Sequence, residues 1–130
     1  MSTIFSKIIT GEIPSFKIKE DESFYAFLDI RPIEKGHTLV IPKYEVDRFF
    51  DMEDKYLSQI LLFAKPIVKA IETVISCQRV GSLIAGTEVP HAHLHLVPLI
   101  DMSRFSFAYA KPAEQLELKH ISEKIVSALR

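Results

Sequence analysis

Several features that would direct this 130-residue chain to a special environment are scarce in it. Its single cysteine, Cys77, cannot form an internal disulfide, which is typical of proteins in a reducing compartment. No apolar run approaches the roughly 20 residues that a membrane-spanning helix needs, and residues 1–7 contain no signal-peptide core. The formal net charge is -1, and lysines and arginines form no run, which argues against nucleic acid or a membrane surface as a partner. We therefore expect a cytoplasmic protein.

The composition is that of an ordinary globular protein, with 48% hydrophobic and 25% charged residues. A chain of this length can bury one sizeable core and is too short for two. The sequence contains no internal repeat, no low-complexity segment and no linker. We expect residues 1–130 to form a single domain.

Hydrophobic spacing predicts five strands and three helices. The strands are expected at residues 15–19, 24–30, 37–41, 79–85 and 91–98, which are short alternating or apolar runs bounded by turn residues. A short helix is expected at residues 4–9, one long helix at 51–76 with Pro66 inside it, and a C-terminal helix at 112–129. Residues 100–111 lack a period and predict a loop. The elements predict an α+β fold, a five-stranded antiparallel meander sheet with helices on one face.

The stretch at residues 91–98 reads His-Ala-His-Leu-His-Leu-Val-Pro. Because a strand sends alternate side chains to opposite faces, His91, His93 and His95 are expected on one face. The apolar residues between them would then face the core. Three imidazoles on one strand face indicate an active site rather than packing.

Two kinds of chemistry fit such a row. Nitrogens that share a zinc ion lie within about 4 Å of one another, whereas the outer histidines start ~13 Å apart on a straight strand. A metal site would therefore need further ligands such as His37 or Glu88. The alternative is phosphate chemistry, because a neutral imidazole is a nucleophile near pH 7 and its neighbours can bind phosphate oxygens. His93 has a histidine on each side and is the best candidate for the nucleophile.

The histidine motif resembles that of the histidine triad (HIT) superfamily. The similarity extends to residues 4–14, 26–32 and 36–43, which resemble the opening helix and the second and third strands of that family. The chain is most similar to the Hint-like branch, which comprises purine nucleoside phosphoramidases and related nucleotide hydrolases.

This resemblance implies a role for each matching residue. His93 would attack the α-phosphorus of a nucleotide conjugate, such as a phosphoramidate or a dinucleoside polyphosphate, and form a covalent nucleotidyl-histidine. His95 would contact the phosphate, with His37 and His91 in supporting hydrogen bonds, and Asp29 would bind the ribose. The residues implied for the base pocket are Phe5, Ile8, Phe27 and Ile30. The family further implies a purine nucleotide substrate and a homodimer, and we expect no metal or other cofactor.

The chain departs from the family at two places. Some members bind a structural zinc where this chain carries Thr3, Ser6 and Glu45, and we expect no zinc there. The residues before the triad usually donate hydrogen bonds to phosphate, and here they are Thr87, which can donate, and Glu88, which cannot when ionised. A nucleotide-binding or scaffolding protein with weak catalysis and a metal-dependent hydrolase therefore stay open as alternatives.

Overall fold

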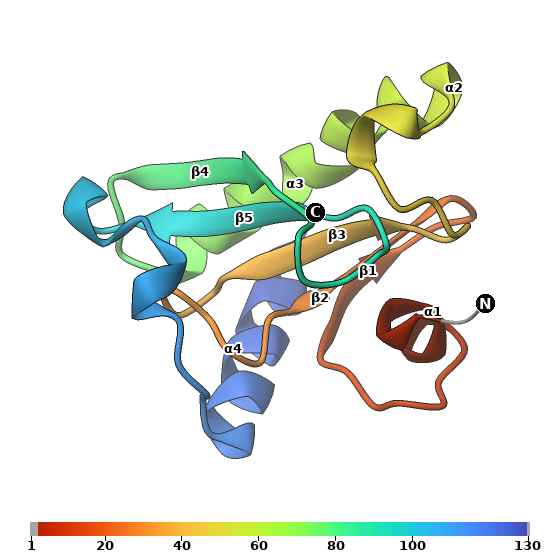
Figure 1. The fold of residues 1–130 in the computed structure, drawn as a ribbon. Coiled ribbons are helices and arrows are strands. Elements are labelled where there is room, and N and C mark those ends of the chain that lie inside the picture. Colours follow the sequence, from red (N-terminus) through yellow and green to blue (C-terminus); the bar gives the residue numbers. More distant parts are fainter. Residues whose placement is uncertain (1–2, 130) are drawn as a thin grey trace.

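The computed structural model describes residues 3–129, and its central element is one five-stranded antiparallel sheet (Figure 1). The strands are β1 (Lys17–Glu20), β2 (Phe24–Leu28), β3 (Thr38–Pro42), β4 (Arg79–Ile84) and β5 (Leu94–Leu99), in the spatial order β1-β2-β3-β5-β4. The α+β fold is therefore confirmed. The meander extends only through β3, because the chain then crosses the sheet and returns with β4 at the edge, so that β5 pairs with both β3 and β4.

Helices cover both faces of this sheet. The elements are α1 (Ile4–Ile9), α2 (Asp54–Leu57), α3 (Ile60–Val74) and α4 (Gln115–Ala128), with 3-10 turns at Phe49–Asp51, Met102–Arg104 and Phe107–Tyr109. On β2, Phe24 and Ala26 pack into the core beneath α3 and α4, whereas Tyr25 packs with α1 on the other face. The prediction that all helices lie on one face of the sheet is therefore wrong for α1. Figure 1 shows this helix in front of the sheet, away from α3.

The predicted long helix over residues 51–76 is also wrong, because the structure divides it in two. The Ser58 hydroxyl donates to the carbonyl oxygen of Lys55 at 3.2 Å. The Gln59 amide instead donates to Tyr56 O at 3.0 Å, so the helical ladder is interrupted there. Pro66 lies inside the second piece, α3. No helix within residues 3–129 is both long and apolar enough to cross a membrane.

The histidine segment enters the sheet later than predicted. Strand β5 begins at Leu94, and before it the Ala92 amide donates to Val46 O at 2.7 Å instead of joining the sheet ladder. The alternation nevertheless persists, since Ala92, Leu94 and Leu96 belong to the core beneath α3 and α4. The imidazoles consequently face the side of the sheet on which α1 lies.

Candidate active site

Four histidines form one continuous cluster on that face. His37 immediately precedes β3, and β3 pairs with β5, so its ring lies 5.2 Å from the ring of His95, centroid to centroid. The His93 and His95 rings are 4.9 Å apart, and Phe5 of α1 contacts both His91 and His93 edge to face. All four imidazoles are at least 94% buried. The structure thus brings together the four histidines predicted for the site.

Hydrogen bonds fix the tautomers of His37 and His95. The Ile33 amide donates to His37 Nδ1 at 3.0 Å, so the proton of a neutral His37 must sit on Nε2. That Nε2–H donates to His95 Nδ1 at 2.9 Å. The remaining proton of His95 is therefore on its Nε2, which makes this atom a hydrogen-bond donor. The Ile33 amide thus determines, through His37, which nitrogen of His95 carries the proton.

His93 has the opposite tautomer, with its proton on Nδ1. Its Nδ1–H donates to the carbonyl oxygen of His91 at 2.7 Å, which leaves a lone pair on Nε2. Nε2 of His93 and Nε2 of His95 have no hydrogen-bond partner in the described chain. Within residues 3–129 every buried side-chain nitrogen or oxygen has such a partner, so these two atoms are not buried. Because both residues line a cavity, both atoms open into it. A nucleophilic lone pair and an N–H donor consequently stand side by side.

His91 is itself held by hydrogen bonds at both ring nitrogens. Its Nε2–H donates to Pro42 O at 2.9 Å, so its Nδ1 accepts from the Thr3 hydroxyl, also at 2.9 Å. Thr3 is the N-cap of α1, and the Ser6 hydroxyl of the same turn donates to Glu45 at 2.8 Å. Thr3, Ser6 and Glu45 are therefore joined by hydrogen bonds. They connect α1 to His91.

Burial keeps the four histidines neutral. It lowers the pKa of His37 to about 3, with the neighbouring His95 and His93 acting in the same direction. Burial also lowers the pKa of His95 to about 4 and lowers the pKa values of His91 and His93. Near pH 7 all four imidazoles are therefore uncharged, which is the state that the hydrogen-bond pattern requires and the state in which His93 can act as a nucleophile.

Asp29 lies beside the cluster, at the end of β2. Its Oδ1 accepts from the Arg31 amide at 2.8 Å, and its Oδ2 lies 3.6 Å from His37 Nε2. This approach is not an ion pair, because His37 is neutral. Burial, and secondarily the charge of Glu88, raises the pKa of Asp29 to about 6.

Asp29, His37 and His95 are also close enough to hold a metal, with candidate ligand atoms within 4.8 Å of one another. The tautomers oppose it. A metal on His37 Nε2 would push the ring proton to Nδ1, where the Ile33 amide already donates. The cluster as folded therefore fits a hydrogen-bonded relay better than a metal centre.

Two cavities flank the histidine row. One, of about 120 Å³, lies on the side of α1, β2 and β3 and contains the predicted Phe5, Ile8, Phe27, Asp29 and Ile30, together with residues that we had not singled out, such as Ile13 and Leu39. The other, of about 170 Å³, lies on the side of β4 and is lined by Ala85, Gly86, Thr87, Glu88, His93, His95 and Phe107. Every predicted site residue thus lies in the histidine cluster or in a cavity beside it.

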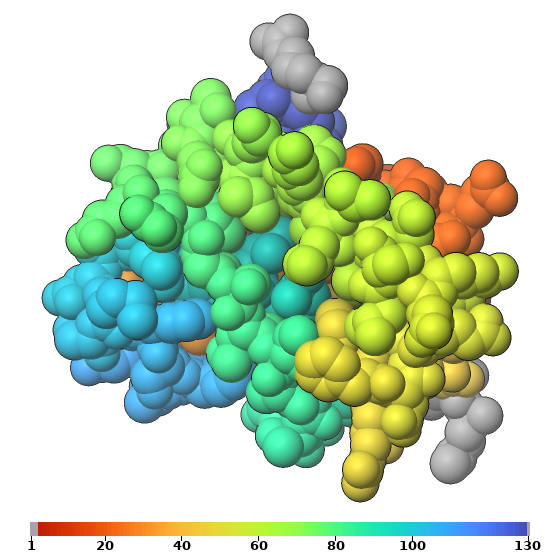
Figure 2. Space-filling view, turned by 90° about the horizontal axis from the view of Figure 1, so that it is seen from above, coloured from red at the N-terminus to blue at the C-terminus, as the bar shows by residue number. Residues whose placement is uncertain are grey.

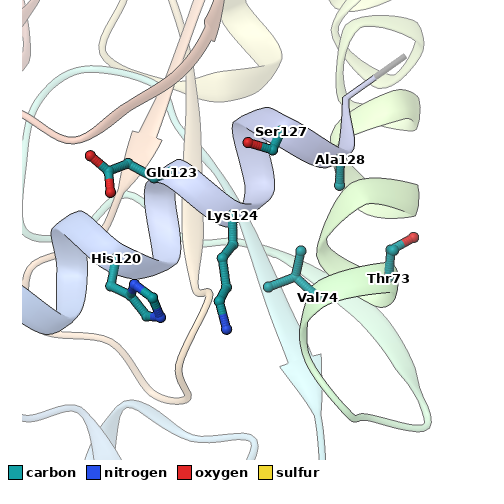
Figure 3. A pocket seen from close by; sticks show the side chains of 7 residues that line it. All are labelled: Thr73, Val74, His120, Glu123, Lys124, Ser127 and Ala128. Atoms are coloured by element: carbon teal, nitrogen blue, oxygen red, sulfur yellow. The ribbon is translucent and has the colours of Figure 1, made fainter.

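A larger hollow of about 610 Å³ lies elsewhere, as an open groove between α3 and α4. Figure 3 shows its side chains, among them His120 and Lys124, spread along the two helices without converging on a common point. Size alone does not identify the active site here. The smaller cavities contain the chemistry.

Comparison with known proteins decides the family. The HIT domain family matches residues 10–102, which is more than half of the sequence. The chain belongs to the HIT family. Adenosine 5'-monophosphoramidase HNT1 of Saccharomyces cerevisiae is 46% identical over 100 residues, which cover 75% of this chain and 63% of the yeast protein, so the chain spans less than two thirds of that relative. The hnt1 phosphoramidase of Schizosaccharomyces pombe is 36% identical over 135 residues, covering both chains completely.

Solved HIT structures agree with this fold. A Hit-like protein from Bartonella henselae involved in cell-cycle regulation has a TM-score of 0.87 and 28% identity, covering 98% of this chain and 96% of its own. A zinc-bound histidine triad protein from Mycobacterium smegmatis has a TM-score of 0.84 and 29% identity, covering 99% and 94%. The family, the fold and the predicted resemblance are therefore confirmed.

An aromatic residue of this HIT site was also missed from the sequence. Phe107 lies in the loop predicted over residues 100–111, yet its ring is 5.1 Å from that of His95, and it lines the cavity on the β4 side. The loop is held by Arg104, whose Nε donates to Glu34 at 2.9 Å and whose guanidinium lies over Tyr109. Aromatic residues in an aperiodic segment were the available signal, but they did not indicate a partner.

Proposed function

We propose that this HIT protein hydrolyses purine nucleotide conjugates at the α-phosphate, nucleoside phosphoramidates above all, through a covalent nucleotidyl group on His93. The observation that carries the proposal is the polarity of two adjacent nitrogens. His93 Nε2 presents a lone pair to the cavity, and His95 Nε2 presents an N–H beside it. The 5'-monophosphoramidase activity named for the yeast relatives supports the same reaction.

The reaction has two displacements. In the first, the lone pair of His93 Nε2 forms a bond to the α-phosphorus while the bond from phosphorus to the leaving nitrogen breaks. That nitrogen keeps the bonding pair and takes a proton from water in the open cavity. In the second, a water oxygen bonds to phosphorus, the phosphorus–Nε2 bond breaks with its electrons returning to His93, and the water proton is released. Phosphoramidate and water thus yield the amine and the nucleoside monophosphate.

The other residues bind and orient in this proposal. His95 Nε2–H donates to a phosphate oxygen, where negative charge concentrates in the transition state. The His91 carbonyl oxygen accepts the hydrogen bond of His93 Nδ1–H, which stabilises the positive charge that His93 gains on attack. His37 fixes His95, Asp29 accepts from the ribose hydroxyls, and the apolar cavity beside α1 takes the base. Thr87 donates its hydroxyl to phosphate from the opposite cavity.

We also propose that the chain acts as a single domain and forms a homodimer through the β4 edge. β4 ends the sheet and pairs with β5 on one side only. Figure 2 looks onto this edge, and large apolar side chains are exposed on β4 and at the start of α3, namely Ile84, Leu61 and Leu62. Such side chains and an unpaired strand edge favour association with a second copy. The lone cysteine supports a cytoplasmic location.

Turnover of adenosine 5'-phosphoramidate tests the proposed activity. We expect the purified protein to release AMP from it, and His93→Ala to reduce kcat/KM by at least about 10³-fold, as loss of a nucleophile does. His120→Ala, on the exposed face of α4, is the matched control. Because Glu88 in the cavity opposes an anionic phosphate, a nucleotide-binding protein without catalysis is the second candidate. Tight AMP binding with no turnover by the wild type would favour it.

A further inference from the structure

The cavity on the β4 side carries two features that the reaction above does not use. Glu88, an exposed residue of the loop between β4 and β5, contributes a carboxylate to its wall. Phe107 contributes an aromatic ring that is 42% exposed. Both lie around the same space of about 170 Å³ as the reacting faces of His93 and His95. An acid and an aromatic ring at this point need an explanation, because the substrate is itself an anion.

The position of this cavity assigns it a part of the substrate. The apolar cavity beside α1, which takes the base in the proposed function, is reached from β2 and β3. The Glu88 cavity is lined instead by the loop that follows β4 and by the Phe107 turn. His93 lies between them, in edge-to-face contact with Phe5 of the first cavity and as part of the wall of the second. With the nucleoside on one side, the leaving group occupies the other.

The charge of Glu88 reaches the reacting groups. Its carboxylate raises the pKa of both Asp29 and His93, acting on His93 against the larger effect of burial. The same field repels a phosphate oxygen placed against His93. A positive charge in the cavity would reverse the sign of that interaction.

We propose, resting on the proposed function, that Glu88 and Phe107 form a leaving-group site that selects amines with a second, positively charged nitrogen. A protonated alkylamine, whether the side chain of lysine or a free diamine, is attracted both by a carboxylate and by the face of an aromatic ring. Glu88 and Phe107 offer this pair of partners in one cavity. The charged nitrogen is not the one that leaves, so it keeps its protons while the phosphorus–nitrogen bond breaks as described above.

Two matched compounds test the selectivity. In one, adenosine 5'-phosphate is joined through nitrogen to 1,4-diaminobutane and ends in an ammonium; in the other, it is joined to pentylamine and ends in a methyl group of similar size. For the wild type we expect kcat/KM to be about tenfold higher for the ammonium compound, which corresponds to about 1.4 kcal/mol. The ratio should approach one in Glu88→Gln and fall part-way in Phe107→Leu. Glu22→Gln, in the exposed β1–β2 turn, should keep the wild-type ratio.

Binding separates this proposal from the proposed function. Calorimetric titration of both compounds into His93→Ala gives a ratio of Kd values that needs no turnover, and we expect the same preference there, lost again in His93→Ala/Glu88→Gln. A wild-type ratio near one, or a ratio that Glu88→Gln leaves unchanged, would overturn the leaving-group site while leaving hydrolysis intact. A preference that appears only with added Mg²⁺ and vanishes with a chelator would overturn it too, since Glu88 would then be holding a metal. Absence of turnover with the expected Kd ratio would contradict only the proposed reaction.

Discussion

Lowering the pH from 8 to 5 should destabilise this protein through two buried histidines. The pKa values of His37 and His95 are lowered from 6.5 to about 3 and about 4, because their rings are buried. The unfolded chain therefore binds protons below pH 6.5 that the folded protein does not. The stability that these neutral rings provide is present above pH 6.5 and is lost progressively as the pH falls toward the folded pKa values.

The size of the loss follows from these pKa values. At pH 5 an unfolded histidine with a pKa of 6.5 has gained about 2 kcal/mol of protonation free energy, so His37 and His95 together cost about 4 kcal/mol relative to pH 8. Asp29 acts in the opposite direction, because its folded pKa of about 6 lies above the ordinary 3.8. Its protonation in the folded state therefore adds about 1.4 kcal/mol to the free energy of unfolding at pH 5. These groups together predict a net loss of about 2.5 kcal/mol.

Urea unfolding followed by circular dichroism at pH 8 and pH 5, at one fixed protein concentration, measures this loss. In His37→Gln the difference between the two pH values should shrink by about 2 kcal/mol, because one of the two neutral rings is gone. His120→Gln, on the exposed face of α4, should leave the difference as in the wild type. Equal pH dependence in the wild type and in His37→Gln would refute the assignment of His37 as a buried neutral link to His95.

Three further predictions concern binding, packing and metals. KM for adenosine 5'-phosphoramidate should fall as the pH rises through about 6, because Asp29 ionises there and both of its oxygens can then accept from the ribose. Asp29→Asn should abolish this step in KM. A step of equal size in the variant would exclude Asp29 as the ribose acceptor. Ile67→Ala, at a fully buried position of α3, should lower the free energy of unfolding by about 2–5 kcal/mol in the same urea assay while kcat/KM at 25 °C changes little. Treatment with EDTA followed by gel filtration should leave kcat unchanged, and a loss restored by zinc would contradict metal-free chemistry.

The sequence predicted the local patterns of this fold well. Alternating histidines and apolar residues indicated which side chains face the core, and Ala92 and Leu94 do so even though the first histidines precede β5. The alternation survives because the apolar residues must be buried whether or not the backbone joins the ladder. His37 was expected beside the row if its strand lay alongside, and the pairing of β3 with β5 places it 2.9 Å from His95.

What the sequence did not predict depends on contacts between distant segments. The placement of β5 between β3 and β4 and the face chosen by α1 follow from tertiary packing. The break after α2 lies at Ser58 and Gln59, where the Gln59 amide donates to Tyr56 O, and hydrophobic periodicity gives no sign of it. Phe107 reaches His95 from an irregular turn, so neither spacing nor period indicated its position.

The nucleophile can be observed directly by intact-mass analysis of the protein quenched in acid-free buffer during turnover of adenosine 5'-phosphoramidate. We expect wild-type protein heavier by one adenylyl group, with fragmentation placing that group on His93, and no such species in His93→Ala. The His120→Ala control should carry the same adduct as the wild type. Turnover by the wild type with an adduct on another residue, or undiminished AMP release by His93→Ala, would contradict the proposal that His93 attacks phosphorus.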